Sequence, residues 1–436
     1  SSNQESSAYN SMASGGVNMD NVEFVLGPTD SYWTRDYGPW WVVDGNRDMS
    51  VVDFTYNRPR PNDNDAPQKI SNHLNTPYFS IDLVHAGGNY MTDGLGISAS
   101  SDLVFVENNL SDEEVLTIME NYYGIDTYHV VSDPNNTYID HIDCWGKYLS
   151  TSKVIIREVP STHPQYNEIE EIAEYFSNSI TKWNEPWQLY RVWTPSNQPY
   201  TNSLILNDKV MVPITGSSWD DEALAVYSTA MPGYEVMGFS GSWESTDALH
   251  CRVKGIPDLQ MLQIFHNPLN DSIAPEPNGY RVDAMVDDLS ESGLISDSMK
   301  IFWKTDQIDN WNSAPLYQSD IPESFNDWSG WIPALADSSD IYYYIKSADS
   351  SGRIEQNPMA GWHTFFAYPT DACLEWDLGD LDNSGELNII DILLLADQII
   401  EGSISGSCSG FVSDVNGDSQ ITIVDILLLV NMISNP

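Results

Sequence analysis

The segment Trp33-Thr34-Arg35-Asp36-Tyr37-Gly38-Pro39-Trp40 places a carboxylate beside an arginine, between two tryptophans. Three further polar segments follow it along the chain: Gly87-Gly88-Asn89-Tyr90, His141-Ile142-Asp143 and Ala248-Leu249-His250-Cys251. Together they supply two carboxylates, an imidazole and a thiol. These are the groups needed to hold a guanidinium and to attack its central carbon. The sequence therefore indicates chemistry on a guanidinium.

Each group has a separate task in such a reaction. A guanidinium is planar, cationic and poorly electrophilic, so carboxylates such as Asp36 and Asp143 must hold its N–H edges. Cys251 is suited to be the nucleophile, because a thiolate attacks more readily than water. A free cysteine has a pKa of about 8.5, which a nearby cation lowers, and the substrate is itself such a cation. His141 is suited to protonate the leaving nitrogen and then to activate water.

Taken singly, each of these residues has an ordinary structural explanation. Cys251 fits a buried apolar position, and His141 fits a hydrogen-bonded position in the core or at the surface. Asp36 can form a plain ion pair with its neighbouring arginine, and Asn202 can belong to a turn. The functional interpretation depends on finding all of them in one chain.

The four segments, in this order, resemble the bacterial peptidylarginine deiminases of the Porphyromonas type, which are relatives of agmatine deiminase. The similarity covers roughly residues 15–260. It implies a pentein fold, a pseudo-fivefold α/β propeller of ββαβ modules with the site at its centre. An immunoglobulin-like domain is expected to follow the propeller. Because family members carry more sequence before the first segment, we expect the propeller to be N-terminally incomplete.

The resemblance also assigns roles to matching positions. Cys251 would attack the guanidinium carbon, and His141 would move protons. Asp36 and Asp143 would hold the guanidinium nitrogens, with ammonia released and a covalent thiouronium hydrolysed to citrulline. The remaining matched positions would place the nucleophile, wall the aliphatic stem and shape the pocket: Asn202, Trp33 and Tyr138. No cofactor is expected for catalysis, and calcium is not expected at this site.

The segment Tyr56-Asn57-Arg58-Pro59-Arg60-Pro61-Asn62 bears on the choice of substrate. Two arginines separated by one proline can form a fork for a carboxylate. In the enzymes that this chain resembles, an equivalent pair binds the α-carboxylate of a C-terminal arginine. We therefore expect Arg58 and Arg60 to select peptides or proteins that end in arginine. The alternative for this segment is an exposed loop with two solvated arginines.

Two other functions stay open on the sequence. The first is a small-molecule deiminase that acts on agmatine or free arginine. The second is a catalytically inactive, calcium-dependent scaffold component. The complete set of reactive side chains favours an enzyme.

The distribution of apolar residues predicts three domains. Short apolar runs alternate with helical stretches as far as Pro268, including a helix capped by Ser111 and another ending near Ser177, which indicates an α/β domain. Short strand-like runs separated by Pro, Gly, Asn and Ser follow, and these predict an immunoglobulin-like β-sandwich. We expect a pentein deiminase domain over 1–268, the sandwich over 269–371 and a small all-α calcium-binding domain over 374–436.

The tail contains an internal repeat: Asp380-Leu381-Asp382-Asn383-Ser384-Gly385-Glu386 recurs, with substitutions, from Asp414, and each copy leads into Asp-Ile-Leu-Leu-Leu. Oxygen ligands at loop positions 1, 3, 5, 7 and 12 are typical of an EF-hand-like calcium loop. The predicted ligands of two calcium ions are Asp380, Asp382, Ser384, Glu386 and Asp391, then Asp414, Asn416, Asp418, Gln420 and Asp425. Aspartate at position 12 and the paired repeats resemble the type I dockerin, which implies a cohesin-type scaffold partner. The recognition positions 10 and 11 are apolar here, either for that partner or for internal packing: Ile389, Ile390, Ile423 and Val424.

Composition limits the remaining possibilities. A formal net charge of −46 argues against nucleic-acid binding, which needs clustered lysine and arginine. No apolar run approaches the ~20 residues of a membrane span. We expect a secreted or surface-associated protein. The sequence leaves open whether Cys373 and Cys408 form a disulfide.

Overall fold

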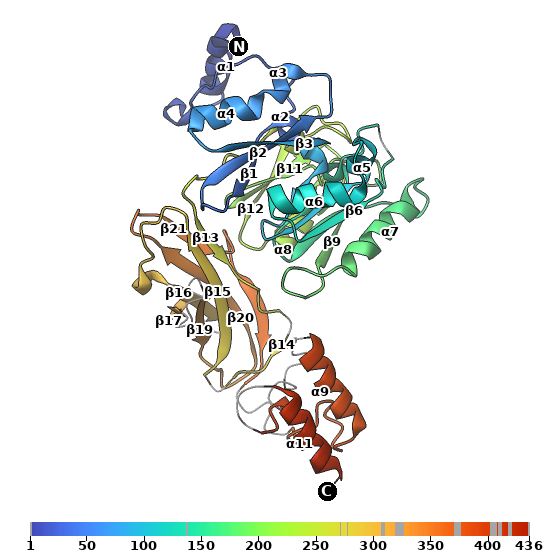
Figure 1. Cartoon of the computed structure of the whole chain (residues 1–436), viewed down its shortest axis with the longest axis vertical. Helices are drawn as coiled ribbons and strands as arrows, with labels where there is room; N and C mark the ends of the chain where they lie inside the picture. Colours follow the sequence, from blue (N-terminus) through green and yellow to red (C-terminus); the bar gives the residue numbers. More distant parts are fainter. Residues whose placement is uncertain are drawn as a thin grey trace. The chain divides into compact units, whose positions relative to one another are not determined.

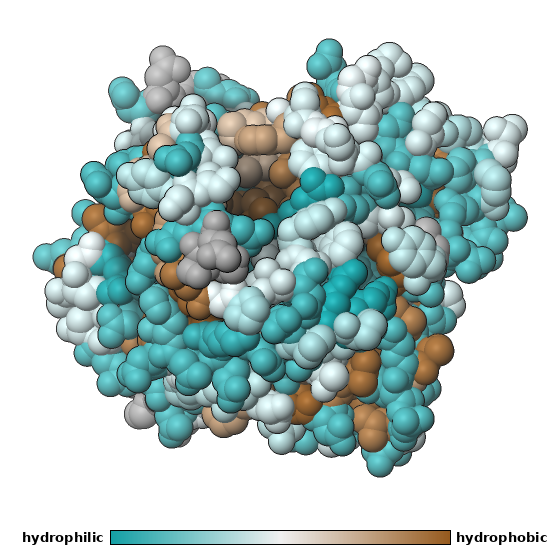
Figure 2. Space-filling model, turned by 90° about the horizontal axis from the view of Figure 1, so that it is seen from above, coloured by the Kyte–Doolittle hydropathy of each residue, from teal (hydrophilic) through white to brown (hydrophobic). Residues whose placement is uncertain are grey.

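The computed structural model describes residues 2–136, 138–270, 272–276, 278–306, 310–318, 327–369, 376–401, 408, 412–416 and 421–434. Contacts divide the chain into two units, Ser1–Gln260 and Met261–Pro436, called unit 1 and unit 2 below. Each unit is described by itself. Among the described residues, no helix is long and apolar enough to cross a membrane. The face in Figure 2 is mainly hydrophilic, with hydrophobic residues gathered in a recess.

A ββαβ module recurs along unit 1 (Figure 1). In every copy an antiparallel pair of strands is followed by a helical segment and a third strand parallel to the second. A helical crossover is the usual way to join two neighbouring parallel strands.

The four modules have the following elements. The first module has β1 (Trp40–Val43), β2 (Met49–Tyr56), α3 (Pro61–Asn64), α4 (Ala66–Leu74) and β3 (Tyr78–His85). The second has β4 (Met91–Thr92), β5 (Ile97–Ser101), α5 (Leu103–Val106), α6 (Asp112–Tyr123) and β6 (Thr127–Val131). The third has β7 (Gly146–Tyr148), β8 (Lys153–Glu158), α7 (Tyr166–Ser177) and β9 (Gln188–Trp193). The fourth has β10 (Leu204–Leu206), β11 (Lys209–Ile214), α8 (Asp220–Ala230) and β12 (Glu235–Ser240).

The described part of unit 1 contains four such three-stranded sheets, with no strand pairing between them. A pseudo-fivefold propeller needs five modules. The α/β modules are thus as predicted, whereas the fivefold arrangement stays a prediction. Before the first module lie α1 (Ser2–Ser14), η1 (Met19–Asn21) and α2 (Thr34–Tyr37).

Local signals explain two of the helices. Ser111 caps α6 through a capping box with Glu114, and Gly124 ends the helix with a φ of 65°, as the capping and C-cap preferences require. The helix expected to end near Ser177 is α7, which runs to that residue. Both helix predictions are confirmed.

The sheets form apolar cores because their central strands are buried on both sides. Residues Val154, Ile155 and Ile156 of β8 are fully buried, and one side of this strand packs with Trp145 and Phe176. A strand covered on both faces needs a continuous apolar run rather than an alternating one. The polar site residues therefore come from the segments between strands.

In unit 2, two sheets share one hydrophobic core. The strands alternate between buried and exposed residues, as in β15, which is typical of sheets with one covered face. The four-stranded sheet has β13 (Leu262–Phe265), β15 (Tyr280–Asp288), β19 (Asp327–Ile332) and β18 (Tyr317–Gln318). The six-stranded sheet has β14 (Ser272–Ile273), β22 (His363–Ala367), β20 (Ser339–Ala348), β16 (Lys300–Thr305), β17 (Asn312–Pro315) and β21 (Ile354–Asn357). The immunoglobulin-like assignment stays a prediction.

The described part of the tail contains helices α9 (Ile389–Glu401) and α11 (Ile423–Ser434), which contact each other. Leu381, Leu395, Val412 and Leu429 form the buried part of their shared core. The four apolar residues at positions 10 and 11 of the two loops are exposed, between 46% and 68%, so they are not packed internally. Cys408 is buried and disulfide-bonded, and Cys373 lies outside the described residues.

Candidate active site

Cys251 is held by the side chain of Asn202. The Asn202 Nδ2–H donates to Cys251 Sγ at 3.2 Å. Its Oδ1 accepts the backbone N–H of His250 at 3.0 Å and that of Cys251 at 3.4 Å. Asn202 is fully buried, where an unpaired amide would be costly, so this amide fixes the short helix η4 (His250–Arg252).

Asp143, in η3 (Ile142–Cys144), lies on another side of the thiol. The Cys251 thiol donates to Asp143 Oδ2 at 3.6 Å, and His250 Nδ1 lies 2.7 Å from the same oxygen. Burial raises the pKa of Asp143, which the nearby His141 opposes. Burial, and then the charges of Asp143 and Asp36, hold the pKa of Cys251 well above its ordinary value. Cys251 is therefore a neutral thiol near neutral pH.

Asp36 is the second buried carboxylate of this cluster. It accepts hydrogen bonds from the Gly88 N–H at 3.2 Å and from the Tyr56 hydroxyl at 3.4 Å. Burial raises the pKa of Asp36 to about 7, against the opposing effect of these bonds and of Arg58. Near neutral pH this carboxyl is thus poised between its two forms.

His141 points into the same space. Its Nδ1 lies 3.7 Å from Asp36 Oδ1. Within the described structure, its buried Nε2 has no hydrogen-bond partner. Burial lowers the pKa of His141 to about 4, so the ring is neutral at pH 7. A neutral imidazole with an unused buried nitrogen can exchange protons with a ligand.

Gly88 marks the centre of the cluster. A Cβ on this residue would lie 2.6 Å from His141 Nδ1, 2.7 Å from Asp36 Oδ1 and 3.3 Å from Asp143 Oδ2. Three polar groups thus surround the space where a side chain would begin. A side chain here would overlap two of these groups and crowd the third, so the helix η2 (Gly87–Asn89) needs a glycine at this position.

The residues predicted to bind substrate are only partly brought together. The guanidinium of Arg60 stacks 4.4 Å from the ring centroid of Trp33 and donates to the Tyr56 hydroxyl at 3.1 Å. Arg58 lies 3.8 Å from Glu107. Tyr138 is 87% exposed, and no contact links it to the other site residues in the described structure.

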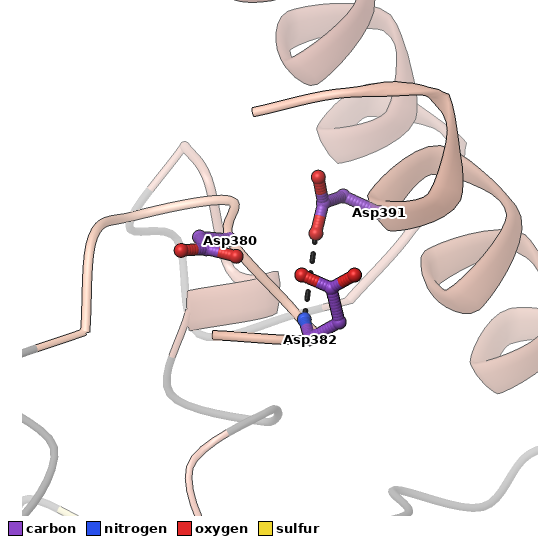
Figure 3. A group of neighbouring side chains, drawn as sticks. All are labelled: Asp380, Asp382 and Asp391. Carbon is purple, nitrogen blue, oxygen red and sulfur yellow. Dashed lines mark hydrogen bonds between the residues drawn. The ribbon is translucent and has the colours of Figure 1, made fainter. Parts of the chain in front are cut away.

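The first tail loop gathers three carboxylates. Ligand atoms of Asp380, Asp382 and Asp391 lie within 4.8 Å of one another (Figure 3). The Asp382 N–H donates to Asp391 Oδ1 at 3.4 Å. Ser384 donates its hydroxyl to the carbonyl of Glu386 at 3.2 Å, so these two ligand candidates also belong to the loop. Oxygen donors grouped in this way fit a calcium ion.

The second loop repeats part of this geometry. Asp425 Oδ1 accepts the N–H of Asn416 at 3.1 Å, as Asp391 does from Asp382. The position of Asp414 is described, whereas Asp418 and Gln420 lie outside the described residues. The second ligand set therefore stays a prediction.

Comparison with known proteins identifies two families in the chain. A family model described as Porphyromonas-type peptidyl-arginine deiminase matches residues 1–257. The chain belongs to this family. The dockerin type I domain model matches residues 378–434, so this deiminase-family chain also carries a type I dockerin domain.

Relatives of the deiminase-family region are moderately distant. The agmatine deiminase of Medicago truncatula is 26% identical over 291 residues, which cover 53% of this chain and 77% of the relative. A Legionella pneumophila protein named "Putative agmatine deiminase" is 24% identical over 242 residues, covering 50% and 69%. The X-ray structure of another protein of that name has a TM-score of 0.52 and 19% identity, covering 57% of this chain and 79% of that one. Unit 1 shares the α/β fold of these deiminases, which hydrolyse guanidino C–N bonds.

Three polar residues of the candidate site were not predicted from the sequence. His250 contacts Asp143, and its place beside Cys251 was a signal that could have been used. Arg35 is next to Asp36, and its Nε–H donates to the carbonyl of His250 at 3.3 Å. Lys147 is buried, and burial lowers its pKa to about 7 despite the opposing charges of Asp143 and Cys251. No pattern near Lys147 pointed to this position.

We predict that Gly88→Ala lowers guanidino deimination at least 100-fold. The added methyl group would overlap His141 and Asp36 and crowd Asp143, so it would push these groups out of their positions. Ammonia release measures the activity, and circular dichroism checks the fold. Gly45→Ala is the matched control, because a Cβ there meets no atom within 4 Å. Wild-type activity in Gly88→Ala would contradict this placement of the site.

We also predict that iodoacetamide alkylates Cys251 slowly at pH 7 and about tenfold faster for each added pH unit, up to at least pH 9.5. The raised pKa of the thiol keeps the thiolate scarce across this range. Peptide mass mapping separates Cys251 from Cys144, the other free cysteine among the described residues. A rate that levels off near pH 8.5 would show an unperturbed thiol and contradict the prediction.

Proposed function

We propose that unit 1 hydrolyses the guanidinium of arginine to citrulline and ammonia, with a preference for arginine at the C-terminus of peptides. The observation that carries this proposal is the convergence of Cys251, Asp36, Asp143 and His141 beside Gly88. Buried carboxylates beside a nucleophile suit a planar cation. The same convergence argues against an inactive scaffold component.

Binding and activation are coupled in this proposal. Asp36 and Asp143 accept the N–H groups of the guanidinium, and Trp33 covers its aliphatic stem. The bound cation offsets the two carboxylate charges that raise the pKa of Cys251, so it favours the thiolate. Asn202 keeps the sulfur in place through its 3.2 Å hydrogen bond.

The proton balance assigns two steps to His141. The Cys251 sulfur forms a bond to the guanidinium carbon, and His141 takes the thiol proton. His141 then gives this proton to the departing nitrogen, so that ammonia leaves and a thiouronium remains. In the second step His141 takes a proton from water while the water oxygen attacks the same carbon. The C–S bond then breaks as the added hydroxyl becomes the carbonyl of citrulline, and the proton of that hydroxyl goes to the sulfur, which leaves as the thiol. His141 releases its proton to solvent, where it converts the ammonia to ammonium.

The preference for a C-terminal arginine rests on Arg58 and Arg60. Arg60 stacks on Trp33, and its bond to Tyr56 links it to Asp36. A carboxylate near this pair would find two guanidinium groups within one short segment. One observation favours the alternative, an agmatine or free-arginine deiminase: Glu107 already neutralises Arg58 at 3.8 Å.

We predict at least tenfold higher kcat/KM for a peptide with a free C-terminal arginine than for the same peptide with that arginine internal. Arg58→Ala should raise KM for the first peptide roughly 10- to 100-fold, the loss of one or two charge-assisted hydrogen bonds. Citrulline formation is the measurement, with agmatine assayed in parallel. Arg281→Ala, in unit 2, is the control. Equal use of both peptides, or faster turnover of agmatine, would overturn the preference.

We propose in addition that the tail binds two calcium ions and docks to a cohesin-type partner. Type I dockerin domains generally bind calcium, and the three grouped carboxylates of the first loop fit that ion. Asp380, Asp382 and Asp391 would hold it with Ser384 and the carbonyl of Glu386. The exposed apolar residues at positions 10 and 11 are suited to the partner.

We predict that calorimetry finds two calcium ions per chain and that Asp391→Asn weakens one of them at least tenfold. The substitution keeps the acceptor oxygen of Asp391 and removes its charge, which attracts the ion. Asp397→Asn is the matched control, because Asp397 lies on the exposed side of the same helix. Equal calcium affinity of the two variants would contradict the assignment.

The wider organisation belongs to the same proposal. Residues 1–268 would form the deiminase domain with a pentein propeller, 269–371 the immunoglobulin-like sandwich and 374–436 the dockerin domain. The two sheets of unit 2 around one core support the sandwich. A dockerin domain and the net charge of −46 support a secreted or surface-associated enzyme.

A further inference from the structure

A cavity of about 610 Å³ lies in unit 1, outside the group of residues used above for catalysis. Its wall includes Gln198, Ser217 and Trp243, with further serine, threonine and asparagine side chains, and none of the lining residues is charged. Most ligand pockets are lined mainly by apolar and aromatic side chains with a few placed polar groups, whereas this cavity is lined mainly by polar residues. This one offers neutral donors and acceptors with an aromatic ring.

Strand order places this cavity at the edge of the sheet that carries the active site. β11 and β12 are parallel, so the residues that follow them, including Ser217 and Trp243, meet at one edge. β10 is antiparallel to β11, so Asn202, just before β10, lies at that edge too. The cavity-lining Ser245 directly precedes Thr246, whose carbonyl accepts from the Cys251 thiol at 3.8 Å.

A series of stacked side chains connects the cavity to the proposed carboxylate clamp. From Arg60 the contacts run to Trp33 at 4.4 Å, then to Tyr32 at 4.7 Å. Arg252 stacks on Tyr32 at 5.3 Å and on Trp243 at 5.0 Å. Asp247 holds the Arg252 guanidinium at 2.8 Å. Since Arg252 follows the nucleophile directly, the wall at Trp243 is fixed relative to Cys251.

The carboxamide of Gln198 is held in an orientation that allows it to bind an amide group of a ligand. Its Oε1 accepts the Ser196 N–H at 3.0 Å, and its Nε2–H donates to the Ser217 hydroxyl at 3.3 Å. A carboxamide has two donor hydrogens and two acceptor positions. These bonds therefore orient the side chain and leave one of each for a ligand, which is the pair that a peptide backbone requires.

We propose that this cavity binds the polypeptide that precedes the reacting arginine, so that the enzyme reads an extended, uncharged stretch of its substrate. This inference rests on the proposed action on C-terminal arginine. The four stacking steps cover at most about 20 Å, the length of roughly six extended residues. A peptide of eight residues is long enough to cover even this largest distance, whereas a dipeptide extends over only about 7 Å.

The test compares the binding of two probes by calorimetry in the Cys251→Ala background, which prevents turnover. The probes are a dipeptide and an octapeptide of alternating serine and alanine, both ending in a free arginine. We expect the octapeptide to bind at least tenfold more tightly. Adding Gln198→Ala should reduce this advantage roughly three- to tenfold, whereas the exposed Gln68→Ala on α4 should preserve it.

The cavity proposal and the proposed function are tested by different measurements. Equal affinity for the two probes, or an octapeptide advantage that Gln198→Ala leaves intact, overturns the cavity proposal. Citrulline formation from the same peptides by the wild-type enzyme decides the proposed function. If no citrulline forms while the length advantage depends on Gln198, the cavity proposal stands and the substrate assignment fails.

Discussion

The carboxyl groups of Asp36 and Asp143 are buried beside the thiol of Cys251. A negative charge on any one of these three groups disfavours ionisation of the other two. Burial raises the pKa of Asp36 to about 7 and raises those of Asp143 and Cys251 as well. A carboxyl with a pKa of 3.8 in the unfolded chain then binds more protons when folded, so its contribution to stability falls as pH rises from about 4 to 7. A guanidinium between the two carboxylates offsets this cost. It also lowers the pKa of Asp36, so binding strengthens as pH rises through about 7 and weakens below it.

The repeated module explains how polar residues that are far apart in sequence come to lie in one region of unit 1. Asp36 comes shortly before β1, Asn89 before β4, Asp143 before β7 and Asn202 before β10. The segment at the start of each module thus supplies a polar side chain to the same region. Asn89 has a structural task there, because its Oδ1 accepts the N–H groups of Ser101 and Ile142. These four residues all lie in the segments that lead into the first strand of a module, outside the central strands.

This arrangement also limits what the sequence can predict. The motifs identified Asp36, Asp143, His141 and Cys251, because reactive residue types in a known order are informative in themselves. Lys147 carries no such signal: it lies inside β7, and only tertiary packing buries it beside the thiol. Tyr138 differs from these residues, since a position matched by resemblance is 87% exposed here, and its role at the pocket stays a prediction. The lining of the neutral cavity was also missed, because serine, glutamine and asparagine next to proline are typical of ordinary turns.

The tail also holds carboxylates close together, and there the last carboxylate of each loop lies at the N-terminus of a helix. Asp391 Oδ2 accepts the Asn388 N–H at 2.8 Å while Asn388 caps Ile390 at 2.8 Å, and Asp425 and Thr422 repeat this exchange at 2.8 and 3.2 Å. The last carboxylate of each loop therefore also closes a capping box at the start of its helix. No lysine or arginine follows Arg353, so the helix N-terminus is the local positive group available to this carboxylate. A calcium ion at the loop, as proposed, would act on the carboxylate at the start of the helix and would couple calcium binding to helix formation. In unit 1 the proposed cation is a guanidinium substrate, which would leave after reaction, whereas an ion in the tail would remain bound.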